Sequence, residues 1–147
     1  MFFEAAFKQL HVHPTECKYL AGNGMGGYFV YLRLLFGIVS GPLLWGRVGA
    51  LAMRATAAMS PPESVRLQCY VDDPILVVGG TPAERRESML KVIFFWCALG
   101  LRLNWKKPQM GNQIQWIRIQ VKVDATRREY ELAIQADKVQ CMEGLTK

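Results

Sequence analysis

The sequence has little cysteine, and its cysteines lack the spacing of a metal or redox motif. Cys17, Cys69, Cys97 and Cys141 are the four cysteines among 147 residues, and no two of them are separated by two residues. This excludes a zinc ribbon or a thioredoxin-type motif of the Cys-x-x-Cys kind. Four cysteines are also too few for a disulfide scaffold of this length, so we expect reduced and mostly buried thiols.

Long uninterrupted apolar runs are absent as well. The most apolar stretch, residues 28–45, contains Arg33 and is broken by Gly37 and Pro42, whereas a membrane helix needs about 20 mostly apolar residues. We therefore expect no membrane partner, and a small membrane-associated protein built on this stretch is the third of three hypotheses. Glu4 and Lys8 interrupt the apolar start, which argues against a signal peptide and predicts a location inside the cell, in cytoplasm or nucleus.

Acidic residues are scarce relative to basic ones, with 12 Asp and Glu against 18 Lys and Arg, a net charge of +6. The chain is nevertheless 51% hydrophobic and 20% charged, so it can bury a core and does not have the composition of a disordered segment. Its length is typical of one domain. The basic balance favours a polyanionic partner, nucleic acid first, although solubility alone explains it equally well.

Local patterns predict two helices and several strands. Residues 43–59 are rich in Leu, Ala and Met, with Ser40 as a candidate N-cap and prolines at the end. A second helix is expected to begin after a capping box formed by Thr81 and Glu84 and to end at Gly100. Strands are predicted at residues 65–70, 75–78, 117–123 and 130–134. This order favours an α+β fold, with helices packed on one face of an antiparallel sheet.

A glycine-rich cluster at residues 22–27 has two interpretations. It superficially matches a dinucleotide-binding loop, but such a loop must follow a strand and open a helix. Here the cluster leads into the strand-like residues 28–32, so a hairpin turn is the better interpretation.

The strongest chemical motif is Tyr70-Val71-Asp72-Asp73 at the tip of an apolar hairpin. Adjacent carboxylates between hydrophobic strands are unfavourable, because like charges repel and burial disfavours ionisation. A hard divalent cation such as Mg²⁺ would relieve that cost, since it prefers oxygen ligands. An exposed Asp-Asp turn without any ligand is the simpler alternative.

With this motif in place, the sequence resembles the palm of a reverse transcriptase from a retrotransposon or retrovirus. The resemblance rests on five blocks in the expected order and covers nearly the whole chain. The blocks are residues 6–10 with 12–14, residues 34–37 with 40–42, residues 70–73, residues 99–104 with 106–107, and residues 116–118.

The resemblance implies two-metal nucleotidyl transfer, with Mg²⁺ or Mn²⁺ activating a primer hydroxyl and stabilising pyrophosphate. It implies an RNA template, a DNA primer and a deoxynucleotide as partners. The implied metal ligands are Asp72 and Asp73, and the implied general acid is Lys107 in preference to Lys106. The implied nucleotide-binding residues are Phe7, which would reject a 2′-hydroxyl, Phe36 and Gly37. The implied primer grip is a hairpin at Trp116, Ile117 and Arg118.

The departures from the family pattern bear on activity. The first catalytic aspartate of the family lies five residues before the aromatic that matches Phe7, and here that position is Phe2. A phenyl ring cannot bind Mg²⁺, so the two-metal site is expected to be incomplete, with Glu4 as a weak substitute. Leu35 replaces a usual proline and Arg118 a usual glycine, while Pro74 directly follows the aspartates.

The expected organisation is a palm fragment at residues 1–123 and the start of a thumb or connection segment at residues 124–147, with fingers and most of the thumb missing. We expect Phe2, Phe3 and Phe7 to be exposed because their packing partners are absent. The favoured hypothesis is therefore an inactive or nearly inactive polymerase fragment. A nucleic-acid-binding remnant without chemistry is the second hypothesis.

Three further groups are weaker candidates. His11, His13 and Cys17 could form a metal site, but the resemblance makes this segment a structural turn. Arg85 and Arg86 fit the solvated start of a helix. A basic cluster in the last third fits phosphate contact, with part of it only surface charge, and consists of Arg102, Lys106, Lys107, Lys122, Arg127 and Arg128.

Overall fold

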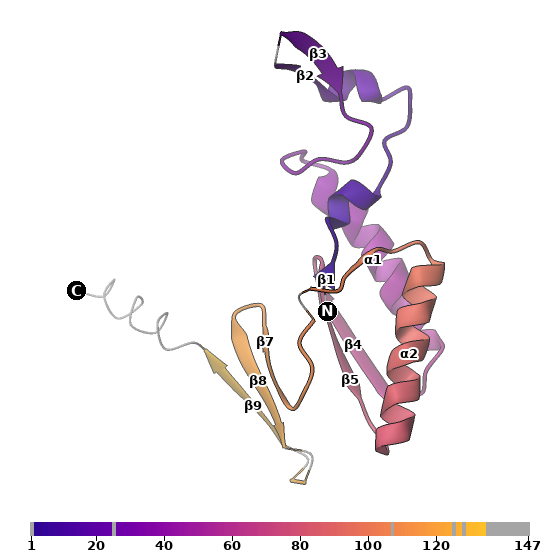
Figure 1. Cartoon of the computed structure of the whole chain (residues 1–147), viewed down its shortest axis with the longest axis vertical. Helices are drawn as coiled ribbons and strands as arrows, with labels where there is room; N and C mark the ends of the chain where they lie inside the picture. Colours follow the sequence, from indigo (N-terminus) through magenta and orange to yellow (C-terminus); the bar gives the residue numbers. More distant parts are fainter. Residues whose placement is uncertain (1, 25, 107, 125, 128, 135–147) are drawn as a thin grey trace, which may run out of the picture. The chain divides into compact units, whose positions relative to one another are not determined.

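The structure, a computed structural model, describes residues 2–24, 26–106, 108–124, 126–127 and 129–134 (Figure 1). The chain divides into two compact units, Phe2–Asn104 and the part that begins at Trp105. The first unit contains β1 (Phe2–Phe3), the 3-10 helices η1 (Ala6–Gln9) and η2 (Cys17–Leu20), β2 (Ala21–Gly24), β3 (Gly27–Val30), α1 (Gly41–Ala58), β4 (Val65–Tyr70), β5 (Asp73–Val78), α2 (Pro82–Ala98) and β6 (Leu103–Asn104). The second unit contains β7 (Gln113–Trp116), β8 (Ile119–Asp124) and β9 (Glu129–Ile134).

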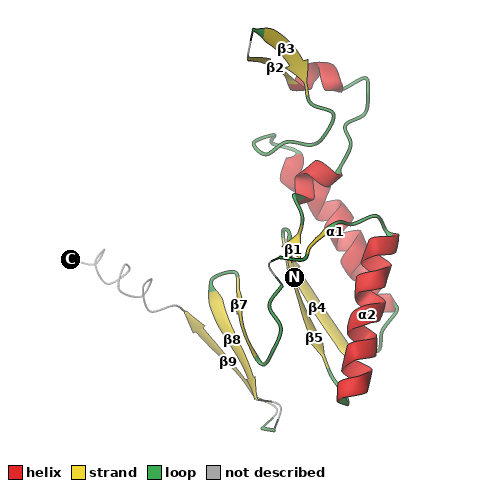
Figure 2. Ribbon diagram, in the orientation of Figure 1, coloured by secondary structure: helices red, strands yellow, loops and turns green. Residues whose placement is uncertain are grey.

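The predicted α+β class is confirmed, with helices and small antiparallel sheets (Figure 2). Among the described residues the strands form four small sheets rather than one: β1–β6, β2–β3, β4–β5 and β7–β8–β9. Both α1 and α2 contact the β4–β5 hairpin, so this hairpin and the two helices form the centre of the first unit. The boundary expected at residue 123 stays a prediction.

Helix α2 begins and ends as its sequence predicts. The Thr81 hydroxyl accepts a hydrogen bond from the Glu84 N–H at 3.4 Å, and the Glu84 carboxylate accepts one from the Thr81 N–H at 2.7 Å. At the other end, Gly100 has φ +76°, and Leu101 N–H donates to the Trp96 carbonyl. These bonds are a capping box and a Schellman motif, both formed from residues close in sequence.

Helix α1 begins differently from the prediction. Ser40 has φ −78° and ψ −13°, and its side chain makes no capping hydrogen bond. An N-cap residue normally has extended backbone, which brings its hydroxyl to the free N–H groups of the first turn. The Ser40 backbone is already helical, so the predicted cap is wrong, although Pro42 lies in the first turn as expected.

The N-terminal aromatic residues pack inside the first unit. Phe3 is 3% exposed and its ring lies 5.5 Å from that of Trp45 and 5.4 Å from that of Trp96. Phe7 is 4% exposed and packs against Phe36. The expectation that Phe3 and Phe7 would be exposed is therefore wrong, because Trp45 on α1, Trp96 on α2 and Phe36 in the loop before α1 supply their partners. The side chain of Phe2 lies outside the described residues.

A polar contact joins helices α1 and α2 in this core. Trp96 Nε1 donates to Thr56 Oγ1 at 2.8 Å, and the Thr56 hydroxyl donates to the Ala52 carbonyl at 2.7 Å. Trp96 and Thr56 are both fully buried, so these bonds satisfy polar groups that would otherwise destabilise the core.

The glycine-rich cluster forms the β2–β3 hairpin, as the sequence predicts. Gly22 pairs with Phe29, and a Cβ at Gly22 would lie 2.6 Å from the Phe29 ring. The cluster thus serves close strand pairing, and it does not open a helix. Within the described part of the chain, neither helix is long and apolar enough to cross a membrane.

In the second unit, the strand predicted at residues 117–123 begins later. Ile117 and Arg118 have φ 42° and 69° and form a two-residue turn between β7 and β8. Two consecutive positive φ angles define a type I′ hairpin turn, which normally uses Asn or Gly. Ile117 and Arg118 carry no such turn signature, so the pattern of the sequence did not predict strand β7. The hairpin that the resemblance implied at residues 116–118 is present.

Candidate functional site

The aspartates lie at the tip of the β4–β5 hairpin. Tyr70 pairs with Asp73 across it, and Val71 and Asp72 are the two central residues of the turn. Val71 has φ 55° and Asp72 has no positive φ, which is the type II′ pattern. A β-branched residue at this position is a genuine outlier and costs on the order of 1–3 kcal/mol. Contacts around the turn must therefore stabilise its conformation.

Two hydrogen bonds from other elements reach the carbonyls of this turn. The Trp45 indole Nε1 donates to the Val71 carbonyl at 2.8 Å, and the Phe3 backbone N–H donates to the Asp72 carbonyl at 3.0 Å. The donors come from α1 and β1, which are distant from the turn in sequence. The turn is thus fixed by the tertiary structure on two sides.

Pro74 is accommodated in β5 by the same register. Because residue pairs alternate along an antiparallel ladder, the pair next to the closing pair Tyr70–Asp73 is not hydrogen-bonded. That pair is Cys69–Pro74, so the donor that proline lacks faces away from β4. The Pro74 ring is fully buried and contributes to the core instead.

The electrostatics of the turn are visible at Cys69. Burial, and to a smaller extent the negative charges of Asp72 and Asp73, together raise the pKa of the Cys69 thiol to about 11. Both carboxylates are half-buried. The two adjacent carboxylates thus lie close enough to Cys69 for their charges to act on its thiol.

The candidate metal ligands at this turn are the two adjacent carboxylates of Asp72 and Asp73. In the ranges that the structure describes, no group of three or more His, Cys, Asp or Glu side chains could hold a metal ion. Glu4 has an exposed side chain, and its backbone N–H donates to the Arg102 carbonyl at 2.9 Å. Two adjacent carboxylates fit one weakly held, largely hydrated Mg²⁺. By themselves they do not fit a two-metal centre.

Strand β1 lies beside the turn. Its backbone pairs with β6, Phe2 with Asn104 and Phe3 with Leu103, and Phe3 also bonds to Asp72. Position 2 is therefore adjacent in the chain to the residue that contacts the carboxylate turn. That position 2 matches the family's first catalytic aspartate stays a prediction.

The predicted nucleotide-binding residues lie together. The rings of Phe7 and Phe36 are 4.6 Å apart, and the Phe7 ring is 6.5 Å from that of Trp45. Phe36 is 69% exposed and covers Phe7, so Phe36 presents the larger aromatic surface to solvent. Gly37 has φ +90°, which permits the sharp bend after Phe36.

The remaining predicted site residues are placed only in part. Lys107 lies outside the described residues, and Lys106 is exposed. Trp116, Ile117 and Arg118 lie at the β7–β8 turn of the second unit, with Arg118 at a positive φ where glycine would be unstrained. Their roles stay predictions.

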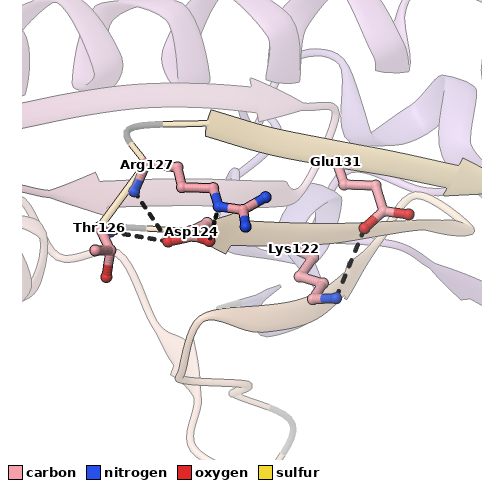
Figure 3. A network of polar contacts seen from close by, with 5 residues as sticks. All are labelled: Lys122, Asp124, Thr126, Arg127 and Glu131. Atoms are coloured by element: carbon pink, nitrogen blue, oxygen red, sulfur yellow. Dashed lines mark hydrogen bonds and ion pairs between the residues drawn. The ribbon is translucent and has the colours of Figure 1, made fainter.

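Two basic residues of the second unit have acidic neighbours. Lys122 Nζ lies 3.7 Å from the Glu131 carboxylate, and Arg127 Nε lies 3.9 Å from that of Asp124. Figure 3 shows both pairs as dashed lines. Asp124 also accepts hydrogen bonds from the backbone N–H groups of Thr126 and Arg127. Exposed ion pairs of this kind contribute about 0–1 kcal/mol, but they reduce the charge that these cations offer to a phosphate. Arg128 lies outside the described residues.

The segment with His11, His13 and Cys17 has the contacts of a structural turn. His13 Nδ1 lies 2.8 Å from Thr15 Oγ1, and Cys17 Sγ donates to the His13 carbonyl at 3.6 Å. Both contacts close the loop onto itself.

Sequence reasoning missed Trp45, which contacts both groups of candidate residues. Its ring lies beside Phe3 and Phe7, and its N–H reaches the Val71 carbonyl. The available signal was a single tryptophan within a helix otherwise rich in small and aliphatic residues. A buried tryptophan usually places its N–H on a partner, which could have prompted the search for one.

The comparisons with known proteins concern the fold. No sequence model of a protein family matches this chain, and neither does any curated protein. Solved structures of a foamy viral protease-reverse transcriptase do match. The complex with RNA/DNA hybrid has a TM-score of 0.74 at 17% identity, covering 95% of this chain and 18% of that one.

Two further structures of the foamy viral protein agree. Its complex with dsDNA has a TM-score of 0.75 at 16% identity, covering 95% of this chain and 27% of that one. The form named dRH, also with double-stranded DNA, has a TM-score of 0.75 at 16% identity, and the match covers 95% of this chain and 23% of that one. This chain thus has a reverse-transcriptase-like fold and spans 18–27% of the length of these structures.

Proposed function

We propose that the chain is the palm part of a retroelement reverse transcriptase that retains a carboxylate turn for a divalent cation and lacks catalytic activity by itself. The observation that carries the proposal is the hydrogen bond from Phe3 N–H to the Asp72 carbonyl. It brings strand β1, which begins with Phe2, beside the Asp72–Asp73 turn. The fold shared with the foamy viral reverse transcriptase supports the same assignment.

The cation bound at this turn would be Mg²⁺ or Mn²⁺, held by Asp72 and Asp73. Magnesium keeps most of its waters when few protein ligands are present, so binding would be weak. A millimolar site is about 4 kcal/mol weaker than a micromolar one. Because a two-metal reaction needs carboxylates that hold both ions in place, and position 2 is phenylalanine, we expect no nucleotidyl transfer.

Nucleic acid is the proposed partner. The foamy viral structures contain RNA/DNA hybrid or double-stranded DNA, and this chain carries a net charge of +6. Basic proteins bind phosphate backbones without sequence preference, through release of counterions. We expect the same of this chain.

The second candidate function is a nucleic-acid-binding remnant with no metal site. The two candidates differ in their need for Asp72. A remnant needs only the basic surface, part of which forms ion pairs in the second unit. The favoured function also needs the carboxylate of Asp72 at the turn. Divalent-cation binding therefore decides between them.

The test is a titration of the full chain with Mn²⁺, followed by the EPR signal of the free ion. Wild-type protein should bind with a millimolar dissociation constant, and Asp72→Asn should abolish this binding. The matched control is Asp124→Asn, the same substitution at an exposed carboxylate on β8, which should leave binding unchanged. Equal Mn²⁺ binding by wild type and Asp72→Asn would refute the metal site and favour the second candidate, the nucleic-acid-binding remnant.

Primer extension on an RNA template with Mn²⁺ tests the absence of catalysis. No extension is expected from the chain. Robust extension that Asp72→Asn abolishes would show that another carboxylate, Glu4 first, completes the site.

A further inference from the structure

Two tryptophans occupy equivalent environments in the core of the first unit. Trp45 on α1 and Trp96 on α2 are both fully buried, and each donates its indole N–H at 2.8 Å. Both rings lie against Phe3, at 5.5 Å and 5.4 Å. They differ in the acceptor, which is the Val71 carbonyl for Trp45 and the Thr56 hydroxyl for Trp96.

We infer that Trp45 is a positioning residue that holds the Val71–Asp72 turn in its type II′ conformation and thereby orients the carboxylate of Asp72. The effect of Trp45 on metal binding rests on the proposed function. The effect of Trp45 on the turn rests on geometry alone.

The reason lies in the conformation of Val71. Its φ of 55° is unfavourable for a β-branched residue, so the isolated hairpin would prefer another turn. Any such rearrangement would move the Val71 carbonyl away from the indole. Because the indole nitrogen is only a donor and is fully buried, losing this acceptor would leave a polar group unsatisfied in the core.

The indole also connects the turn to the aromatic cluster. Phe7 lies 6.5 Å from Trp45 and 4.6 Å from Phe36, which is largely exposed. One rigid side chain thus contacts both the candidate nucleotide-binding aromatics and the backbone next to Asp72. Residues behind metal ligands typically change metal affinity by about 10–100-fold when they are replaced.

The test compares Trp45→Phe with Trp96→Phe in the full chain. Each variant keeps an aromatic ring in the core and removes one buried N–H, so both should lower thermal stability. Only Trp45→Phe should change the backbone chemical shifts of Val71 that report its φ. It should also weaken Mn²⁺ binding about tenfold, while Trp96→Phe binds like wild type.

The outcomes separate the inference from the proposed function. If wild type binds no Mn²⁺ but the Val71 shifts change only in Trp45→Phe, the metal site fails and the positioning role stands. If both variants or neither change the Val71 shifts, the positioning role is refuted whatever the metal result.

A measurement on proteins that keep Trp45 covers the case in which Trp45→Phe does not fold. Hydrogen exchange of the two indole N–H groups is compared in wild type and in Val71→Gly, whose turn is free of strain. Slower exchange at Trp45 alone supports the coupling between indole and turn. Faster exchange at Trp45, equal changes at Trp45 and Trp96, or no change refute it.

Discussion

The backbone N–H of Phe3 donates a hydrogen bond to the carbonyl of Asp72 at 3.0 Å. This bond joins the first strand of the chain to the turn that carries the two aspartates. It gives position 2 a defined relationship to a candidate metal site, although a phenylalanine stands there.

Phe2→Asp should therefore strengthen divalent-cation binding. A third carboxylate near Asp72 and Asp73 adds charge and oxygen ligands, so the Mn²⁺ dissociation constant should fall about tenfold, equivalent to about 1.4 kcal/mol. Phe2→Asn is the matched control, since it is polar and of the same size without the charge. Equal affinities for the two variants would contradict the placement of position 2, and weaker binding in Glu4→Gln would identify Glu4 as a ligand.

Val71→Gly should stabilise the chain. Glycine adopts a positive φ without steric cost, and relief of strain should exceed the added entropy of the unfolded chain, for a net gain of about 1 kcal/mol in the free energy of unfolding. Val77 is a matched control because it is 48% exposed, against 46% for Val71, and lies within β5. Val77→Gly should lose about 1 kcal/mol in urea unfolding. Destabilisation by both substitutions would argue against strain at Val71.

The Cys69 thiol should react slowly with iodoacetamide. Burial and the two aspartates raise its pKa to about 11, so at pH 8.5 little thiolate forms, and the exposed Cys97 should be alkylated first. Asp72→Asn should lower the pKa of Cys69 and speed its alkylation, measured by peptide mass spectrometry. Asp124→Asn should not.

The same pKa predicts a dependence of stability on pH. The folded thiol keeps its proton above pH 9.0, its ordinary pKa, where the unfolded thiol loses it. The contribution of Cys69 to stability is thus fully present below pH 9 and declines as pH rises toward 11. A Cys69→Ala variant should lose this part of the decline, and an unchanged profile would contradict the prediction.

Thr81→Ala should destabilise α2 by about 1 kcal/mol, because it removes the N-cap. The hydrogen bonds that the Glu84 carboxylate accepts from Thr81 lower the pKa of Glu84 below its ordinary value of 4.5. The charged capping box therefore contributes above about pH 4.5 and is lost as pH falls through the lowered pKa, so the difference from wild type should narrow in acid. Ser88→Ala, within the same helix, is the control and should change the free energy of unfolding little.

Nucleic-acid binding should weaken steeply with salt. A fluorescent single strand titrated with the chain should show a linear fall of log affinity with log salt, without sequence preference. Arg102→Gln should reduce the slope by about 1 if Arg102 contacts phosphate. Arg85→Gln, at an exposed arginine on the first turn of α2, should leave it unchanged. An affinity that is flat between low and moderate salt would contradict phosphate contact.

The sequence by itself determined the features that depend on neighbouring residues. The capping box at Thr81, the glycine stop at Gly100 and the strand at Val65–Tyr70 were predicted and confirmed. In each, the partners lie within a few residues, or the pattern of side chains along one strand is sufficient. The reverse-transcriptase-like fold was likewise recognisable from five short blocks.

Only the tertiary structure decided how these elements meet. The Val71 turn, the burial of Phe3 and Phe7 and the bond from Trp45 to the Val71 carbonyl all depend on groups far apart in the chain. The turn at Ile117 and Arg118 has no glycine or asparagine to indicate it, and Ser40 has the residue type of a cap without its backbone conformation. Packing overrides weak local preferences in such places, because burying tryptophan and phenylalanine side chains contributes more free energy than the conformation of one residue costs.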